Sequence, residues 1–186
     1  MKLILFTVFM ALFLVLTSAS LQGQGFPVSF QADYVDISKH EEVTGKYYAG
    51  PEGMRMESMM DGEQQILIVN FTQGASWIVM EEELMYYELP QGQDAADSFT
   101  SVCPELTVKE TMVGQETLHG RGVEKWHCEK YDGRVDKVWF DSRLKVAIRT
   151  EERGNIFELR NIREGRVSSD LFQPPEGYTR LSLPGM

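Results

Sequence analysis

Residues 43–89 form five short stretches of alternating polar and apolar residues, with a turn signal between each stretch and the next. The turns contain Gly, Asp or clustered acidic residues, which tight hairpins favour. They are Gly50-Pro51-Glu52-Gly53, Asp61-Gly62, Phe71-Thr72-Gln73-Gly74 and Glu81-Glu82-Glu83-Leu84. The pattern predicts a meander of five antiparallel strands.

Side chains alternate along a strand, so turns of even length keep the same parity across each hairpin. One face of the predicted meander is then almost wholly apolar and carries Tyr47, Ala49, Met54, Met56, Leu67, Val69, Ile78, Met80, Met85 and Tyr87. The other face carries Lys46, Tyr48, Arg55, Glu57, Ile66, Ile68, Trp77, Val79, Tyr86 and Glu88. On that second face Lys46 lies opposite Glu57, a cross-strand charge pair that supports this register.

A second meander is predicted for residues 123–131, 135–141, 145–150 and 155–162. With even turns, one of its faces carries Trp126, Cys128, Val135, Trp139, Val146, Ile148, Phe157 and Leu159, and Arg149 lies opposite Glu158 on the other. A further strand is predicted near Phe30 and Tyr34. The expected fold is therefore mainly β (α+β): a curved antiparallel sheet or incomplete β-barrel of about ten strands, with one or two short helices as a lid.

The first 20 residues differ from the rest of the chain. Lys2 precedes an apolar run that ends near Leu16, and small residues follow at 17–20. This order is typical of a secretory signal peptide, and the apolar run is short for a membrane span. We therefore expect a signal peptide at 1–20, cleavage after Ser20 or a few residues later, and a single domain at 21–186. Since no cysteine lies near this site to accept a lipid, we expect a periplasmic or secreted protein.

The charge of the chain limits its partners. Eighteen basic residues against 28 acidic ones give a net charge of −10, and the basic residues form no patch in the sequence. Such a surface repels nucleic acid and anionic lipid headgroups. We therefore expect no nucleic-acid partner.

The two cysteines, Cys103 and Cys128, are predicted to form a disulfide, because their number is even and the compartment is expected to be oxidising. The bond would contribute about 3 kcal/mol of stability. A metal site with His119 and His127 is the alternative, but the spacing matches no CxxC or HExxH motif. Residues 94–99 favour a helix, so residues 89–106 would form a lid pinned across the apolar face; a surface loop is the alternative interpretation.

The first meander has few helices available to cover its apolar face, so this face is predicted to form a hydrophobic groove. Methionine adapts to ligands of several shapes and is frequent in such grooves. The predicted ligand-binding residues are Tyr47, Met54, Met56, Leu67, Val69, Ile78, Met80, Met85 and Tyr87. The alternative is an ordinary sealed core made of the same side chains.

Several of these stretches resemble a known family. The order Gly45-Lys46-Tyr47-Tyr48, Gly53-Met54-Arg55-Met56-Glu57, Trp77-Ile78-Val79-Met80 and Met85-Tyr86-Tyr87-Glu88 is similar to the strand succession of the LolA/LolB-like outer-membrane lipoprotein localisation factors and of uncharacterised secreted domains grouped with them. Gly114-Gln115-Glu116-Thr117 with Cys128-Glu129-Lys130-Tyr131, and the C-terminal Leu171-Phe172-Gln173-Pro174-Pro175-Glu176-Gly177-Tyr178, resemble their "GxETxxG…CxxY" and "LFxxPxGY" stretches. The resemblance implies an incomplete barrel around a hydrophobic cavity that receives a lipid or a lipoprotein acyl chain, in a carrier-like or chaperone-like role without cofactors.

Two other functions are weighed against this one. Some proteins of the LolA-like fold sense envelope stress by binding proteins, and an exposed patch of Ile66, Ile68, Trp77, Val79 and Tyr86 would serve that purpose here. A hydrolase is the less favoured alternative, because the sequence has no GxSxG elbow, no Gly-rich phosphate loop and no pair of carboxylates in an apolar setting. We therefore expect a binding protein and not an enzyme.

Overall fold

The computed structural model describes residues 25–38, 42–60, 62–89, 95–104 and 106–181. The signal peptide predicted at residues 1–20 lies outside these ranges. Among the described residues, no helix is long and apolar enough to cross a membrane.

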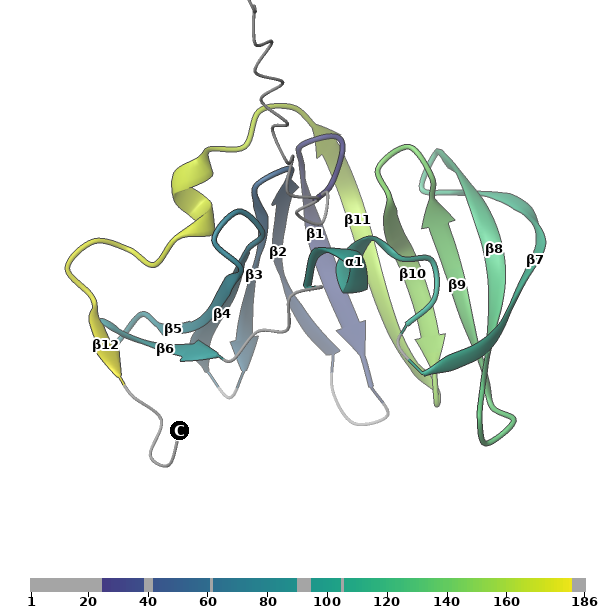
Figure 1. The fold of residues 1–186 in the computed structure, drawn as a ribbon, viewed down its shortest axis with the longest axis horizontal. Coiled ribbons are helices and arrows are strands. Elements are labelled where there is room, and N and C mark those ends of the chain that lie inside the picture. The colour runs from purple at the N-terminus through teal and green to yellow at the C-terminus, as the bar shows by residue number, and fades with distance from the viewer. Residues whose placement is uncertain (1–24, 39–41, 61, 90–94, 105, 182–186) are drawn as a thin grey trace, which may run out of the picture.

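The described residues form one large sheet of twelve strands (Figure 1). The strands are β1 (Phe30–Ile37), β2 (Glu42–Gly50), β3 (Gly53–Met60), β4 (Glu63–Asn70), β5 (Ala75–Met80), β6 (Met85–Leu89), β7 (Thr107–Leu118), β8 (Arg121–Lys130), β9 (Val135–Asp141), β10 (Val146–Glu152), β11 (Asn155–Glu164) and β12 (Thr179–Leu181). The only described helices are α1 (Ala95–Thr100) and the 3₁₀ helix η1 (Ser169–Phe172). The predicted mainly β fold, an open curved sheet with very few helices, is confirmed.

The order of the strands across the sheet is β12-β6-β5-β4-β3-β2-β1-β11-β10-β9-β8-β7. The sequence did not indicate β7, the last strand at one end, or β12, the last at the other. β12 pairs with β6 in parallel, so the sheet is not antiparallel throughout. β7 is twelve residues long, mostly exposed, and its register with β8 shifts twice, between Thr107 and Lys109 and between Met112 and Gly114.

The first meander has the predicted register. Lys46 lies opposite Glu57 across β2 and β3, and Ile78 lies opposite Tyr87 across β5 and β6. The predicted charge pair is not formed, because Lys46 pairs with Asp33 and Glu57 with Arg55. The turns fall at the predicted residues, and Gly62 and Gly74 have φ of +86° and +61°, the left-handed conformation that glycine adopts without steric cost. The predicted division of side chains between the two faces of β2–β6 is therefore confirmed.

The face assignment in the second meander is partly wrong. Arg149 does pair with Glu158. However, the β8–β9 hairpin has an odd loop: Gly133 has φ of +79°, its N–H donates to the Lys130 carbonyl at 2.9 Å, and the Lys130 N–H donates to the Arg134 carbonyl at 2.8 Å. A three-residue hairpin loop with glycine in the left-handed region adds one residue relative to an even turn. As a consequence Trp139 pairs with Lys125, whereas an even turn would pair it with Trp126.

The consequences of this shift follow from the pairs. Trp126 pairs with Val138 and Cys128 with Asp136, so Trp126 and Cys128 lie on the face opposite to Val135, Trp139 and Val146. Across the rest of the sheet, Val138 pairs with Thr150 and Thr150 with Phe157. Cys128 therefore shares a face with Phe157, as predicted.

We call the face on which α1 packs the inner face. Its buried cluster includes Phe30, Tyr34, Tyr47, Met54, Val69 and Leu159, and Ala96 and the half-buried Phe99 of α1 pack against it. The Phe99 ring lies 6.4 Å from that of Phe71. Figure 1 shows α1 in front of the central strands, so this short helix covers the middle of the inner face and does not reach β5 and β6.

The opposite, outer face of β4–β6 is covered by the C-terminal segment. Ile66, Ile68, Trp77 and Val79 are buried, and Tyr86 and Tyr178 pack against them; we call these four residues the outer cluster. The C-terminal segment is held in place by the Asn70 side-chain amide, which donates to the Phe172 carbonyl at 3.0 Å, and by the pairing of β12 with β6. The prediction of an exposed patch here is wrong, because these residues are buried and Tyr178 packs on them. The sequence could not show this, since no pattern in the chain indicates that residues 169–181 return to this face.

Candidate functional site

The nine predicted ligand-binding residues fall into two groups on the inner face. Tyr47, Met54 and Val69 are buried, with exposed fractions of 5%, 2% and 2%. The Tyr47 hydroxyl donates a hydrogen bond to the Met54 Sδ at 3.6 Å, and burial raises the pKa of Tyr47 well above its usual value. These three side chains belong to the cluster under α1 and present no surface to a ligand in this conformation.

The other six predicted residues, Met56, Leu67, Ile78, Met80, Met85 and Tyr87, are half-buried. Met56 and Leu67 pack against the edge of the inner-face cluster. Ile78, Met80 and Tyr87 instead line a cavity of about 300 Å³ at the end of the sheet formed by β4, β5 and β6. We call this the corner cavity.

The register explains why these side chains meet. Gln65 pairs with Met80, and Ile78 pairs with Tyr87, so all four side chains project from the inner face in neighbouring rows. The β5–β6 hairpin then brings Glu82 and Glu83 to the mouth of the cavity, and β4 contributes Glu63 and Gln64. The cavity thus has an apolar floor and an acidic rim.

Sequence reasoning missed the rim. Glu63, Gln64, Gln65, Glu82 and Glu83 line the cavity but were not predicted as site residues. Glu82 and Glu83 were assigned to a hairpin tip, which is where the structure places them. The missing information was that this tip lies beside Ile78, Met80 and Tyr87, which the pattern of a single strand does not contain.

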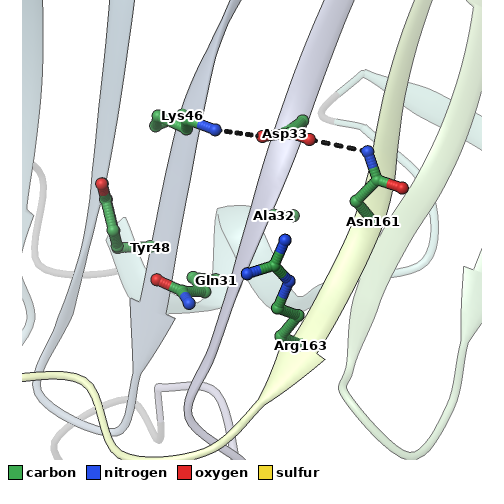
Figure 2. Close-up of a pocket in the computed structure, with 7 residues that line it drawn as sticks. All are labelled: Gln31, Ala32, Asp33, Lys46, Tyr48, Asn161 and Arg163. Atoms are coloured by element: carbon green, nitrogen blue, oxygen red, sulfur yellow. Dashed lines mark hydrogen bonds and ion pairs between the residues drawn. The ribbon is translucent and has the colours of Figure 1, made fainter.

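A second, smaller cavity of about 110 Å³ lies on the outer face at β1, β2 and β11 (Figure 2). One of its lining residues is Asp33, which accepts hydrogen bonds from Lys46 Nζ at 2.5 Å and Asn161 Nδ2 at 2.7 Å. These two bonds hold the pKa of Asp33 below its usual value. Because protein donors already occupy both carboxylate oxygens, this cavity is a weaker candidate for ligand binding.

A third cavity, of about 370 Å³, is lined by His119, Gly120, Arg121, Arg160, Asn161 and Ile162. Beside it the buried Glu158 forms ion pairs with His119, with Arg160 at 3.2 Å and with Arg149 at 3.5 Å. Burial raises the pKa of Glu158, but the hydrogen bonds from His119 and Arg160 bring the net shift below its usual value. Arg121 is likewise bonded to Asp141 and Glu164. The polar groups at this cavity are therefore occupied by one another.

Cys103 and Cys128 form a disulfide, with their Cα atoms 5.7 Å apart. The bond lies in a buried cluster with Val138 and Phe140, and it ties the segment after α1 to β8. Such a bond is typical of proteins from oxidising compartments. Within the described ranges, no group of three His, Cys, Asp or Glu side chains is arranged to hold a metal ion.

No family model and no curated protein matches the sequence. Among solved structures, an uncharacterised conserved protein from Thermus thermophilus matches with a TM-score of 0.60 at 13% identity, over 84% of this chain and 91% of that one. MucB of Pseudomonas aeruginosa, solved in complex with MucA, matches with a TM-score of 0.53 at 18% identity, over 78% of this chain and 55% of that one. A LolA superfamily protein from Nitrosomonas europaea also matches, with a TM-score of 0.40 at 13% identity, over 80% of this chain and 92% of that one.

At these identities the first two matches show a shared fold and leave function open. The chain therefore shares its fold with these two proteins, and a LolA superfamily protein is among its structural neighbours, in line with the resemblance of the sequence motifs.

Proposed function

We propose that this protein binds a hydrophobic ligand in the corner cavity without performing catalysis. The observation that carries the proposal is the cavity itself, whose floor is formed by Ile78, Met80 and Tyr87 on the part of the inner face that α1 does not reach. Its volume of about 300 Å³ lies at the lower end of the range of small-molecule sites in proteins.

The size of the cavity sets the strength of binding. Each methylene transferred from water to an apolar site contributes about 0.8 kcal/mol. An alkyl segment of about six carbons would therefore contribute about 5 kcal/mol, from which the entropic cost of association is subtracted. A longer chain that also covers the half-buried Met56 and Leu67 would bind more tightly.

The proposed ligand is a lipid or a lipidated protein, and the proposed location is the periplasm or the outside of the cell. The disulfide supports an oxidising compartment. The MucA/MucB complex is one in which a protein of this fold binds another protein, and a lipidated protein would combine both kinds of partner. A protein-binding role for the outer cluster is the weaker candidate, because Tyr178 and Tyr86 cover it.

The test compares two Met→Glu variants of the same sheet. Met80→Glu introduces a carboxylate into the corner cavity, whereas Met59→Glu changes a side chain of β3 that is 54% exposed. Titration with the neutral dye Nile red should show saturable binding to the wild type and to Met59→Glu, and at least tenfold weaker binding to Met80→Glu. Near-UV circular dichroism checks that both variants are folded.

Lipid mass spectrometry of organic extracts from purified protein then identifies a ligand retained from the cell. If Nile red binds Met80→Glu as tightly as it binds the wild type, the corner cavity is not the site. If the wild type shows no saturable binding, the proposed function is wrong.

A further inference from the structure

We propose that the corner cavity selects amphiphiles whose polar end is cationic over those whose polar end is anionic. This inference rests on the proposed function and specifies its ligand class. The acidic side chains alone do not define a site; the apolar cavity does, and the acidic side chains determine which end group can sit at its mouth.

The composition of the mouth is one-sided. Three of the eight lining residues are glutamates, Glu63, Glu82 and Glu83, and none is Lys or Arg. All three glutamates are exposed, and within the described residues no ion pair is formed by any of them. The nearest ion pairs of this end of the sheet involve other residues: Arg55 with Glu81 at 3.9 Å and Arg180 with Glu88 at 2.9 Å.

Arg55 and Arg180 do not neutralise the acidic rim, because both lie on the other face of the sheet. Arg55 pairs in register with Ile68, a member of the outer cluster, so its side chain belongs to the outer face. Arg180 pairs with Tyr86, which also packs on the outer cluster. Both cations are therefore on the side of the sheet opposite to Met80 and Tyr87.

An amphiphile bound with its alkyl chain on Ile78 and Met80 must leave its polar end at this mouth. A carboxylate or sulfate there would lie close to Glu82 and Glu83 without a counter-charge, whereas an ammonium would be attracted to both. Exposed charges interact weakly one pair at a time and are screened by salt, but three like charges act together on one end group. We therefore expect about a tenfold preference for the cation at low ionic strength.

The experiment displaces Nile red with three probes that have the same ten-carbon chain and are used below their micelle concentrations: decyltrimethylammonium, decyl sulfate and the uncharged decyl maltoside. The wild type is expected to bind decyltrimethylammonium about tenfold more tightly than decyl sulfate, with decyl maltoside between them. This preference should shrink at high salt.

Two double variants separate the rim from the overall negative charge. Glu82→Gln/Glu83→Gln should reduce the preference to less than threefold while leaving decyl maltoside binding unchanged. Glu110→Gln/Glu152→Gln removes the same charge from exposed positions on β7 and β10 and should keep the preference.

Each other outcome overturns the inference in a distinct way. If all three probes bind the wild type equally, the cavity is a hydrophobic site without headgroup selection, and the proposed function stands. If the preference falls equally in both double variants, the net charge of the protein causes it. If none of the probes displaces the dye, the proposed function and the inference fail together.

Discussion

Replacement of Gly45 by alanine should destabilise the protein far more than a Gly→Ala substitution in a strand normally does. Gly45 lies in β2, opposite Tyr34 of β1 and Ser58 of β3. An ideal Cβ at this position would lie 1.8 Å from the Glu57 carbonyl oxygen and 2.5 Å from Cε1 of Tyr34. Contacts below 3.0 Å essentially never occur, and the nearer atom is backbone, which cannot rotate away.

The size of the effect follows from what must move. To restore a normal contact, β2 and β3 must separate by more than 1 Å at this point, which breaks about two ladder hydrogen bonds worth about 1 kcal/mol each. The Tyr34 ring, which is buried and stacked 5.8 Å from Phe157, must also shift, at an overpacking cost of about 1–3 kcal/mol. We expect a total loss of about 3–5 kcal/mol, or about 6–20 °C in Tm for a domain of this size.

Gly122→Ala is the matched control, because Gly122 lies in β8 and a Cβ there meets nothing within 4 Å. Its Tm should stay within about 2 °C of the wild type or rise slightly, since alanine reduces the entropy of the unfolded chain. Urea denaturation followed by tryptophan fluorescence, together with thermal scans, measures both variants. Equal Tm values for Gly45→Ala and Gly122→Ala would refute the close packing of β1, β2 and β3.

Four further outcomes follow from the structure. Met54→Leu should lower the free energy of unfolding by about 1–2 kcal/mol because the buried Tyr47 hydroxyl loses its acceptor, and adding Tyr47→Phe should recover part of that loss in a double-mutant cycle. Cys103→Ser should cost about 3 kcal/mol and increase binding of a hydrophobic dye to the cluster under α1; unchanged dye binding would mean that the disulfide does not anchor a lid. The pKa of Glu158 is lowered in the folded protein, so its contribution to stability is complete above its ordinary pKa of 4.5 and is lost as the pH falls through the folded value. The Tm of Glu158→Gln should therefore decline less steeply below pH 5 than the Tm of the wild type. Phe172→Ala should cost about 3–5 kcal/mol and increase binding of a hydrophobic dye at the outer cluster, and a Tm unchanged by this substitution would show that η1 does not anchor the C-terminal segment.

The parts of the fold that depend on local chemistry could be predicted from the sequence. Alternation along β2–β6 and the turn residues determined both the register and the side-chain faces, as the position of Lys46 opposite Glu57 shows. The prediction failed at the β8–β9 hairpin, where Asp132-Gly133 is compatible with a two-residue or a three-residue loop. The pairing of Glu129 with Val135 in the folded sheet corresponds to the three-residue loop. This loop places Trp139 on the face opposite to Cys128, whereas a two-residue loop would place both on the same face.

The residues that line the corner cavity were predicted in part for a related reason. Alternation correctly placed Met54, Met80 and Tyr87 on one face, but it contains no information about what covers that face. The structure covers Met54 with the cluster under α1 and leaves Met80 and Tyr87 at a cavity. The return of Tyr178 to the outer cluster is a contact between residues far apart in the sequence, and no local signal indicates it.

The strand β7 has a consequence for the solubility of the protein in a crowded compartment. A long strand at the end of a sheet has unpaired backbone groups on one side and is a template onto which another chain can add. β7 is such a strand, and it exposes Val108, Met112 and Val113. Its two register shifts fall at Val108 and Val113, and bulges of this kind distort an edge so that a flat partner strand cannot pair along its whole length. The irregular register of β7 therefore protects the open sheet from growing into fibrils, a protection that a closed barrel obtains by having no edge.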